Sequence, residues 1–377
     1  MKNKDPGAEK HYAYERVFMY GSLQFCGHIE DYFAKHTRDL LIFIVQPRIG
    51  ARTNLLRTYH DGMVVQEETV RSSQNVFLYY LLWYVNHVRA VVRFCPKKTR
   101  TLILGGHPVV FFGMGLLKRM RPLVYAYWIG DFFPSRHPVI RLFERLKKYY
   151  HDRMPYAYYL SDAINQVMNG TVVDRPARRT VMWGLKPFPA AAVPPLSPFS
   201  LLFVGLIRPG QGLEKLFGFL NEHREYRLSV IGVCQPAFYA ELRRLLDQYG
   251  LDGRVFFPNR FYSESELQQV AAECHLGLAL YDTDPGNFTH YADPGKVKSY
   301  AEMHLPVLMT RISDIVPFVE RFGSGEVIDQ IDQIGDALER IRQNFPRYQA
   351  GVEKFNGYFE YERYYGEAFK ALEESWT

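Results

Sequence analysis

The sequence lacks the features of a secreted, disulfide-stabilised or zinc-stabilised protein. Its 377 residues include only four cysteines, without a CxxC motif or the Cys/His spacing of a zinc site, so they are expected to be reduced packing residues. The first 16 residues are polar and contain no apolar stretch of the kind found in secretion signals, so we expect the protein in the cytoplasm. The cysteines are Cys26, Cys95, Cys234 and Cys274.

Motifs for metal ions and dinucleotides are also missing. The sequence contains no HExxH motif, and its closest approach to a DxD triplet, Asp282 and Asp284, precedes Pro285 and Gly286, which indicate a turn. The GMG at 113–115 lies within a helical pattern and not directly after a strand, so it is not a dinucleotide fingerprint. We therefore expect no metal ion and no cofactor, and the sequence does not favour a dehydrogenase.

The charge is divided unevenly between the two halves of the chain. Lys and Arg outnumber Asp and Glu by 28 to 14 in residues 1–190, but are outnumbered by 18 to 26 in residues 191–377. A basic half suits an anionic partner, and without any nucleic-acid-binding motif we favour a membrane surface or a lipid-linked phosphate over nucleic acid. The inner face of the cell membrane is therefore an expected location. The alternative is that this charge only aids solubility.

Short apolar runs alternate with longer helical patterns in both halves, which indicates two doubly wound α/β domains with parallel sheets covered on both faces. Ligands of such sheets bind beyond the carboxyl ends of the strands. The proline-rich segment near Pro194, Pro195 and Pro198 separates the halves. The predicted strands are 16–20, 40–46, 101–106, 122–128, 157–160 and 180–183 in the first half, and 200–205, 227–233, 254–258, 275–281 and 305–310 in the second.

Two other patterns have alternative interpretations. The run VFLYYLLWYV (76–85) is too short to cross a bilayer, so we interpret it as a buried core helix, with a helix in a membrane interface as the alternative. Aromatic and apolar residues recur at helical spacing from Phe355 to Trp376, which indicates a terminal helix docked on the body of the protein.

The stretch FVGLIRPGQGLEKLF (203–217) places a glycine turn and Arg208 directly before a helix. Helix N-termini carry unpaired N–H groups and partial positive charge, and arginine can donate two parallel hydrogen bonds to a phosphate. The stretch therefore suits a diphosphate, although Gly205 and Gly210 also fit an ordinary tight turn.

A second helix start follows at Asp293, Pro294 and Gly295. Lys296 is unfavourable for the dipole of that helix unless an anion binds there. The sequence thus predicts two helix N-termini on one domain, both suited to a diphosphate.

The two segments together resemble the GT-B glycosyltransferases, and specifically the retaining glycosyltransferase family 4. FVGLIRPGQGLEKLF is similar to that family's glycine turn, and DPGKVKSYAEMHLPVLMT (293–310) to its nucleotide-sugar segment. The resemblance is strong over residues 180–330 and only architectural over residues 1–180. It implies an acceptor-binding domain over residues 1–190, a nucleotide-sugar-binding domain over residues 191–350, and a C-terminal helix over residues 351–377 that returns to the N-terminal domain.

The resemblance implies transfer of a hexose from a UDP or GDP type of sugar to a saccharide or lipid-linked acceptor, with retention and without a metal, in cell-surface polysaccharide or glycolipid synthesis. Arg208 and Lys296 would stabilise the departing diphosphate. This chain departs from the family pattern at Leu206 and Gln211, where the family commonly has an arginine and a lysine, and at Ser299, where it has a ribose-binding glutamate. We expect Ser299 or Glu302 to contact the ribose. The alternative interpretation of Glu302 is a solvated helix residue without a ligand.

Loops of the basic domain are expected to meet the acceptor. The candidates are Gly21, Ser22, His107 and Asp131, the last as a group that binds a sugar hydroxyl or removes its proton. His107 and Asp131 also fit ordinary capping positions. The expected donor-site residues are Gly205, Gln211, Asn259, Arg260, Phe261, Asp293, Gly295, Ser299 and Glu302, with 259–261 near the base.

Two other functions share this fold. A non-catalytic GT-B partner or binding protein is consistent with the departures at Leu206, Gln211 and Ser299. A sugar-nucleotide epimerase would need acid and base side chains deep in its site, and the distribution of His and Glu gives it little support.

Overall fold

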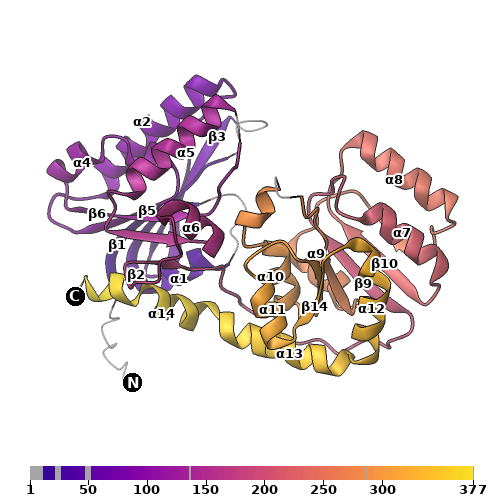
Figure 1. The fold of residues 1–377 in the computed structure, drawn as a ribbon. Helices are drawn as coiled ribbons and strands as arrows, with labels where there is room; N and C mark the ends of the chain where they lie inside the picture. The colour runs from indigo at the N-terminus through magenta and orange to yellow at the C-terminus, as the bar shows by residue number, and fades with distance from the viewer. Residues whose placement is uncertain (1–11, 22–26, 47–51, 136, 285–286, 377) are drawn as a thin grey trace, which may run out of the picture. The chain divides into compact units, whose positions relative to one another are not determined.

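The computed structural model describes residues 12–21, 27–46, 52–135, 137–284 and 287–376. The chain forms two compact units. Unit 1 comprises the described residues of 1–160, 164–181 and 365–377, and unit 2 comprises those of 161–163 and 182–364. Each unit is a sheet with helices on both faces (Figure 1).

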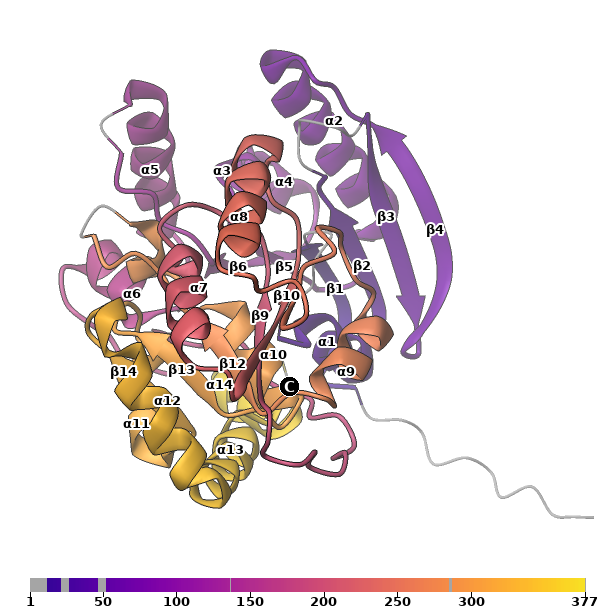
Figure 2. The same ribbon diagram turned by 90° about the vertical axis from the view of Figure 1, so that its right-hand side faces the viewer.

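The described part of unit 1 contains an eight-stranded sheet in the order β4-β3-β2-β1-β5-β6-β7-β8. Its strand pairs are parallel except for β2–β3 and β3–β4, which are antiparallel. The hairpin of β3 and β4 therefore forms one edge of the sheet, as Figure 2 shows. The strands are β1 (Tyr14–Gly21), β2 (Thr37–Ile44), β3 (Thr53–His60), β4 (Met63–Arg71), β5 (Thr101–Gly105), β6 (Leu123–Ile129), β7 (Tyr156–Tyr159) and β8 (Arg178–Thr180).

The helices of unit 1 lie on both sides of this sheet. Helix α14 packs beside α1, with ring centroids of Phe33 and Phe369 5.5 Å apart, whereas α2, α3, α4 and α5 lie on the opposite side (Figure 1). Only the part of α14 from Tyr365 onward belongs to unit 1, and α6 begins in unit 2. The helices are α1 (Ile29–His36), α2 (Val76–Phe94), α3 (Pro108–Phe111), α4 (Met114–Met120), α5 (Pro138–His151), α6 (Asp162–Asn169) and α14 (Tyr361–Glu374).

Unit 2 is built on a six-stranded parallel sheet among its described residues, in the order β11-β10-β9-β12-β13-β14. Its strands are β9 (Phe199–Val204), β10 (Tyr226–Ile231), β11 (Val255–Phe256), β12 (Leu276–Ala279), β13 (Val307–Thr310) and β14 (Gly325–Ile328).

Two apolar cores cover the faces of this sheet. Helices α7, α8 and α12 contribute to one core, and α10, α11 and the second half of α13 to the other. The elements are α7 (Leu213–Glu222), α8 (Pro236–Gln248), α9 (Glu264–Ala271), η1 (Phe288–Tyr291), α10 (Gly295–Glu302), α11 (Val316–Phe322), η2 (Ile331–Gln333), α12 (Ile334–Gln343) and α13 (Phe345–Phe359).

The two doubly wound sheets predicted from the apolar runs are confirmed, but some details differ. The strand expected at 180–183 is found earlier, as β8, and β3, β4 and β14 were not predicted. Strand β4 has mostly exposed side chains and only a short apolar start, Met63 to Val65, and an antiparallel hairpin replaces a further βα unit.

The terminal aromatic stripe is divided between two helices and not carried by one. Helix α13 ends at Phe359 and α14 begins at Tyr361, so the break is at Glu360. Phe355 and Phe359 belong to a core of unit 2, whereas Phe369 packs against Phe33 in unit 1. The predicted return of the terminal helix to the N-terminal domain is confirmed.

The run 76–85 begins α2, which has a buried side and an exposed side. Tyr79 and Trp83 are buried, but Phe77 is 73% exposed. Within the described residues, no helix is both long and apolar enough to cross a membrane.

Candidate anion-binding site

The candidate site begins where β9 and β10 end, at two glycines that lie against each other. Gly205 has a φ of +130° and Gly232 a φ of +153°, both unfavourable for any other residue. A Cβ added at Gly232 would lie 1.8 Å from the carbonyl oxygen of Gly205. The carboxyl ends of these strands therefore need both glycines to approach each other.

The turn after Gly205 is closed by a side chain within it. The Gln211 amide oxygen accepts a hydrogen bond from the Arg208 N–H at 2.8 Å, and its amide nitrogen donates to the Leu206 carbonyl at 3.1 Å. Both ends of the Gln211 amide are thus used inside the turn, and only its second N–H remains to donate to an anion.

Arg208 extends from this turn into solvent. Its side chain is exposed and forms no ion pair among the described residues. The guanidinium is therefore available for an anion at the start of α7, where the unpaired N–H groups of the helix add partial positive charge.

Lys296 carries a buried ammonium group without a hydrogen-bonding partner in the described part of the chain. Its Nζ lies 4.4 Å from the ring centroid of Phe203 and 4.7 Å from that of Tyr281. Burial lowers the pKa of Lys296 to about 7, because no anion compensates for the lost hydration. An ideal Cβ at Gly205 would be 3.9 Å from this Nζ, so the ammonium lies beside the glycine turn.

Helices α7 and α10 follow β9 and β12, which are neighbours in the sheet. Their N-termini therefore lie at the same carboxyl edge of the sheet, with Arg208 in the turn before α7 and Lys296 in the first turn of α10, beside Gly205. The binding of an anion by these two helix starts stays a prediction.

The other side of α10 holds the segment that enters unit 2. The Trp183 N–H donates to Asp293 Oδ2 at 2.7 Å, and the Trp183 carbonyl accepts a hydrogen bond from Lys298 Nζ at 2.9 Å. Glu302 accepts from the Lys186 N–H at 3.0 Å. Glu302 is therefore not a free solvated residue, and Asp293 supports the backbone at Trp183.

The two side chains that bind the backbone at Trp183, Asp293 and Lys298, are both buried and ionisable. Burial raises the pKa of Asp293, although Lys298 opposes the shift, and its Oδ1 has no hydrogen-bonding partner among the described residues. Burial also lowers the pKa of Lys298 to about 7. Sequence reasoning missed Lys298. The only indication in the sequence is that α10 contains a second lysine two positions after Lys296. Ser299 has its side chain half-buried on α10.

The residues expected near a nucleotide base have different roles. Asn259, with a φ of +50°, accepts from the Cys234 N–H at 2.8 Å and so fixes the loop after β11. Arg260 pairs with Glu266 at 2.8 Å and stacks over the Tyr262 ring at 4.0 Å. Phe261 is 62% exposed, which leaves its ring available for stacking.

The expected acceptor residues of unit 1 follow neighbouring strands. Gly21 ends β1, and His107 and Asp131 follow β5 and β6, so these three share the carboxyl edge of the sheet. Ser22 lies outside the described residues.

His107 caps helix α3 and is neutral. Its Nδ1 accepts from the Val109 N–H at 3.2 Å, which places the ring proton on Nε2. Burial and the nearby Lys147 lower the pKa of His107 to about 3. His107 can therefore donate a hydrogen bond to a ligand through Nε2, but its other nitrogen is not available as a base.

Asp131 lies on the loop after β6. Its side chain is exposed at the surface, yet the surrounding protein reduces the hydration of the carboxyl group and raises its pKa, an effect that Lys147 partly opposes. Lys147 donates to the Asp131 carbonyl at 3.0 Å and so fixes the loop. No group of three or more His, Cys, Asp or Glu side chains suited to a metal ion occurs in the described ranges.

No model of a known protein family matches the sequence, and no curated protein matches it. Solved structures do match over nearly their whole length. Sucrose-phosphate synthase (tll1590) from Thermosynechococcus elongatus is 11% identical, with a TM-score of 0.66, and the match covers 96% of this chain and 100% of that chain. The trehalose-6-phosphate protein from E. coli bound with UDP-2-fluoro glucose is 12% identical, with a TM-score of 0.65 and coverages of 95% and 99%.

A third match is the lipopolysaccharide outer core galactosyltransferase WaaB in its apo form, at 14% identity, a TM-score of 0.62 and coverages of 94% and 99%. The chain has the GT-B fold. These likenesses establish the architecture, since they combine near-complete coverage with two doubly wound sheets. The GT-B fold predicted from the two sequence segments is thereby confirmed.

Proposed function

We propose that this GT-B protein is a metal-independent glycosyltransferase, similar to the retaining family 4, that transfers a hexose from a UDP or GDP type of nucleotide sugar to a saccharide or lipid-linked acceptor. The observation that carries the proposal is the buried, unpartnered ammonium of Lys296 beside Gly205, at the start of α10. A buried cation is costly without an anion, and a diphosphate supplies one. The bound UDP sugar of the E. coli trehalose-6-phosphate protein is consistent with this choice.

The diphosphate binds at the starts of α7 and α10. Lys296 donates to it from the buried side and Arg208 from the exposed side, while Gly205 and Gly295 leave the backbone accessible. Phe261 stacks near the base, with Asn259 and Arg260 shaping its loop. Because Glu302 is bound to the Lys186 N–H, Ser299 is the preferred ribose contact.

Cleavage of the bond between the sugar and the diphosphate increases the negative charge on the leaving group. Cations already directed at that position stabilise the transition state more than the ground state, and this is the catalytic role of Arg208 and Lys296. The acceptor oxygen forms the new bond on the face that the diphosphate leaves, so the configuration is retained, and the acceptor proton passes to Asp131 or to the departing diphosphate.

The acceptor is assigned to unit 1. Neutral His107 donates a hydrogen bond to an acceptor hydroxyl, and Asp131 accepts one or takes its proton. Gly21, which ends β1 at the same edge of the sheet, and Ser22, which follows it in the sequence, are further acceptor candidates. We assign acceptor binding to residues 1–190, donor binding to residues 191–350 and the helical C-terminus to residues 351–377, in a cytoplasmic enzyme of cell-surface polysaccharide or glycolipid synthesis.

Thermal stabilisation by nucleotides tests the donor site. UDP, GDP, ADP, dTDP and CMP are each titrated with and without magnesium, and one diphosphate is expected to raise Tm in a dose-dependent, metal-independent way. The shift should disappear in Lys296→Met and weaken in Arg208→Ala. Lys215→Ala is the matched control, because Lys215 is an exposed cation of α7 paired with Asp332 at 2.8 Å. An equal shift in Lys296→Met would remove this site from the proposal.

A non-catalytic binding protein is the second candidate, favoured by one observation. Gln211 stands where the family commonly has a lysine; it is uncharged and its amide is bonded within the turn, so at this position the chain offers no cation to the diphosphate. Release of nucleoside diphosphate from a panel of nucleotide sugars separates the two functions, since a binding protein would be stabilised by the nucleotide but release no product.

A further inference from the structure

Helix α5 has its polar and apolar sides reversed. Its buried residues include Lys147 and His151, and Lys147 pairs with Glu144 at 2.8 Å. The apolar residues of the same helix face solvent: Val139 is 53%, Leu142 56%, Leu146 37% and Tyr149 50% exposed. A helix of a soluble protein ordinarily shows the opposite arrangement.

The exposed residues form two stripes along α5. Successive residues of a helix are rotated by about 100°, so the four apolar residues Val139, Leu142, Leu146 and Tyr149 lie on one side. Arg141 and Arg145 form an adjacent basic stripe. Neither arginine forms an ion pair within the described part of the chain, so their charges are not compensated by the protein. Such a combination is typical of helices that lie in a membrane interface.

The neighbouring helices on this side of the sheet also carry exposed apolar residues. Helices α2, α3, α4 and α5 lie on one side of the sheet of unit 1 (Figures 1 and 2), and Tyr80 of α2 contacts Phe143 of α5 with ring centroids 5.3 Å apart. The additional exposed residues are Val76, Phe77, Leu78 and Leu81 at the start of α2, and Phe112, Leu116 and Met120 on or beside α4.

The charge of this layer is mainly positive, although Arg93 is paired with Glu68 of β4 at 2.7 Å. Residues 75–150 contain thirteen Lys and Arg but only two acidic residues, Asp131 and Glu144. Glu144 is held by Lys147, so it does not offset the exposed cations. A surface that combines exposed apolar side chains with an excess of positive charge is complementary to anionic lipid headgroups above an acyl interior.

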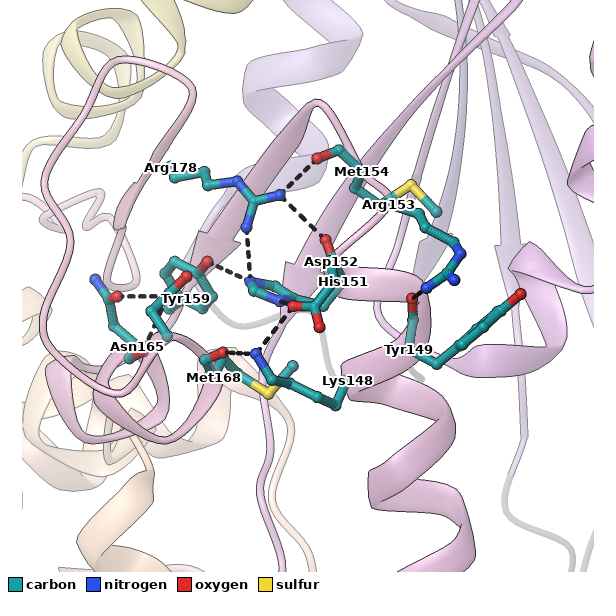
Figure 3. Close-up of polar contacts among 11 residues, drawn as sticks. Lys148, Tyr149, His151, Asp152, Arg153, Met154, Tyr159, Asn165, Met168 and Arg178 are labelled. Atoms are coloured by element: carbon teal, nitrogen blue, oxygen red, sulfur yellow. Dashed lines mark hydrogen bonds and ion pairs between the residues drawn. The ribbon is translucent and has the colours of Figure 1, made fainter.

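The carboxyl end of α5 is held firmly in this orientation, as Figure 3 shows. Buried His151 is bonded to Tyr159 at 2.7 Å and to Asp152 at 2.8 Å, and Arg178 donates to the His151 carbonyl at 3.2 Å. Lys148 also donates to the Met168 carbonyl. The outward direction of the apolar stripe is therefore fixed by the fold.

We propose that the helical layer of α2, α4 and α5 docks on an anionic lipid surface, with Leu142 and Leu146 inserted and Arg141 and Arg145 against the headgroups. This docking is independent of the donor site in unit 2. His107 lies under the same helices, with its ring centroid 5.7 Å from that of Tyr80 and 5.5 Å from that of Phe143. The docked face therefore adjoins the residue assigned to the acceptor.

Sedimentation of the whole protein with vesicles tests this proposal. Phosphatidylcholine vesicles and vesicles with about one third phosphatidylglycerol are compared, and partitioning should be at least tenfold stronger with the anionic lipid and weaker at high salt. Leu142→Ser with Leu146→Ser, and separately Arg141→Glu with Arg145→Glu, should each reduce partitioning at least tenfold.

Two control variants distinguish vesicle binding by this face from non-specific apolar or electrostatic binding elsewhere on the protein. Val64→Ser with Val65→Ser removes exposed apolar residues from β4, and Arg224→Glu with Arg244→Glu reverses exposed charges in unit 2. Both should bind vesicles like the unchanged protein. The nucleotide-dependent Tm shift reports that each variant is folded and tests the donor site separately. Equal binding to both vesicle types, or no effect of the α5 changes, would overturn the proposal, as would binding of the face to a protein or nucleic acid in place of lipid.

Discussion

The ammonium group of Lys296 lies directly beside the backbone of Gly205, so that an added Cβ would be 3.8 Å from its Cε and 3.9 Å from its Nζ. The same glycine has a φ of +130°. One residue thus brings the end of β9 close to the buried cation of α10.

Gly205→Ala is expected to destabilise the protein by about 1–3 kcal/mol, because alanine is strained at this φ. It should also weaken nucleotide binding, since the methyl group would narrow the space beside Lys296. Urea unfolding and the Tm shift with nucleotide measure the two effects. Gly218→Ala is the control: this glycine is inside α7 with no atom within 4 Å of an added Cβ, so alanine should stabilise the helix by about 0.5–1 kcal/mol.

Lys296→Met should raise the stability of the free protein at pH 7 by about 1–3 kcal/mol while abolishing nucleotide binding. The folded-state pKa of about 7 is below the usual lysine value of 10.5, so the unfolded chain binds more protons between these values. The free energy of unfolding of the unchanged protein therefore rises with pH across this range. Denaturant titrations at pH 7 and pH 9.5 should show a smaller rise in the free energy of unfolding for Lys296→Met than for the unchanged protein. An equal rise in both proteins would contradict the assignment of the low pKa to Lys296.

Nucleoside diphosphate binding should be accompanied by proton uptake at pH 8. The free Lys296 is then mostly neutral, and a bound diphosphate raises its pKa, so about 0.5–1 proton is taken up. Calorimetry in buffers of different ionisation enthalpy measures this number. Lys298→Met is the control, because Lys298 has a similar pKa but donates to Trp183, and proton uptake should persist in that variant.

Stability should fall when the pH drops below about 6.5, because buried neutral histidines resist protonation. Burial lowers the pKa of His87 to about 3, so the unfolded chain binds the proton first and the folded state loses about 2 kcal/mol by pH 4.5 from this group. His87→Gln should flatten the decline of Tm with falling pH.

The sequence was sufficient to predict the two doubly wound sheets, because buried parallel strands are continuous apolar runs. It did not predict β4, whose side chains are mostly exposed and whose apolar run stops after Val65. It placed Lys296 at a helix start next to a glycine turn, but not its burial, which depends on Phe203 and Tyr281 from other elements. The reversed orientation of α5 was also not predictable, since an apolar stripe has the same period whether it faces a core or solvent.

The hydrogen bond from Lys147 to the Asp131 carbonyl has a consequence for the rotation of α5 about its own axis. Turning the helix to bury Leu142 and Leu146 would gain apolar burial, but it would take Lys147 away from the Asp131 carbonyl, which lies outside the helix. Glu144 is on the same helix and would turn with Lys147, so their ion pair does not resist the rotation. The bond to Asp131 therefore acts as a rotational lock, which keeps an apolar stripe well suited to a protein interior on the outside of the molecule.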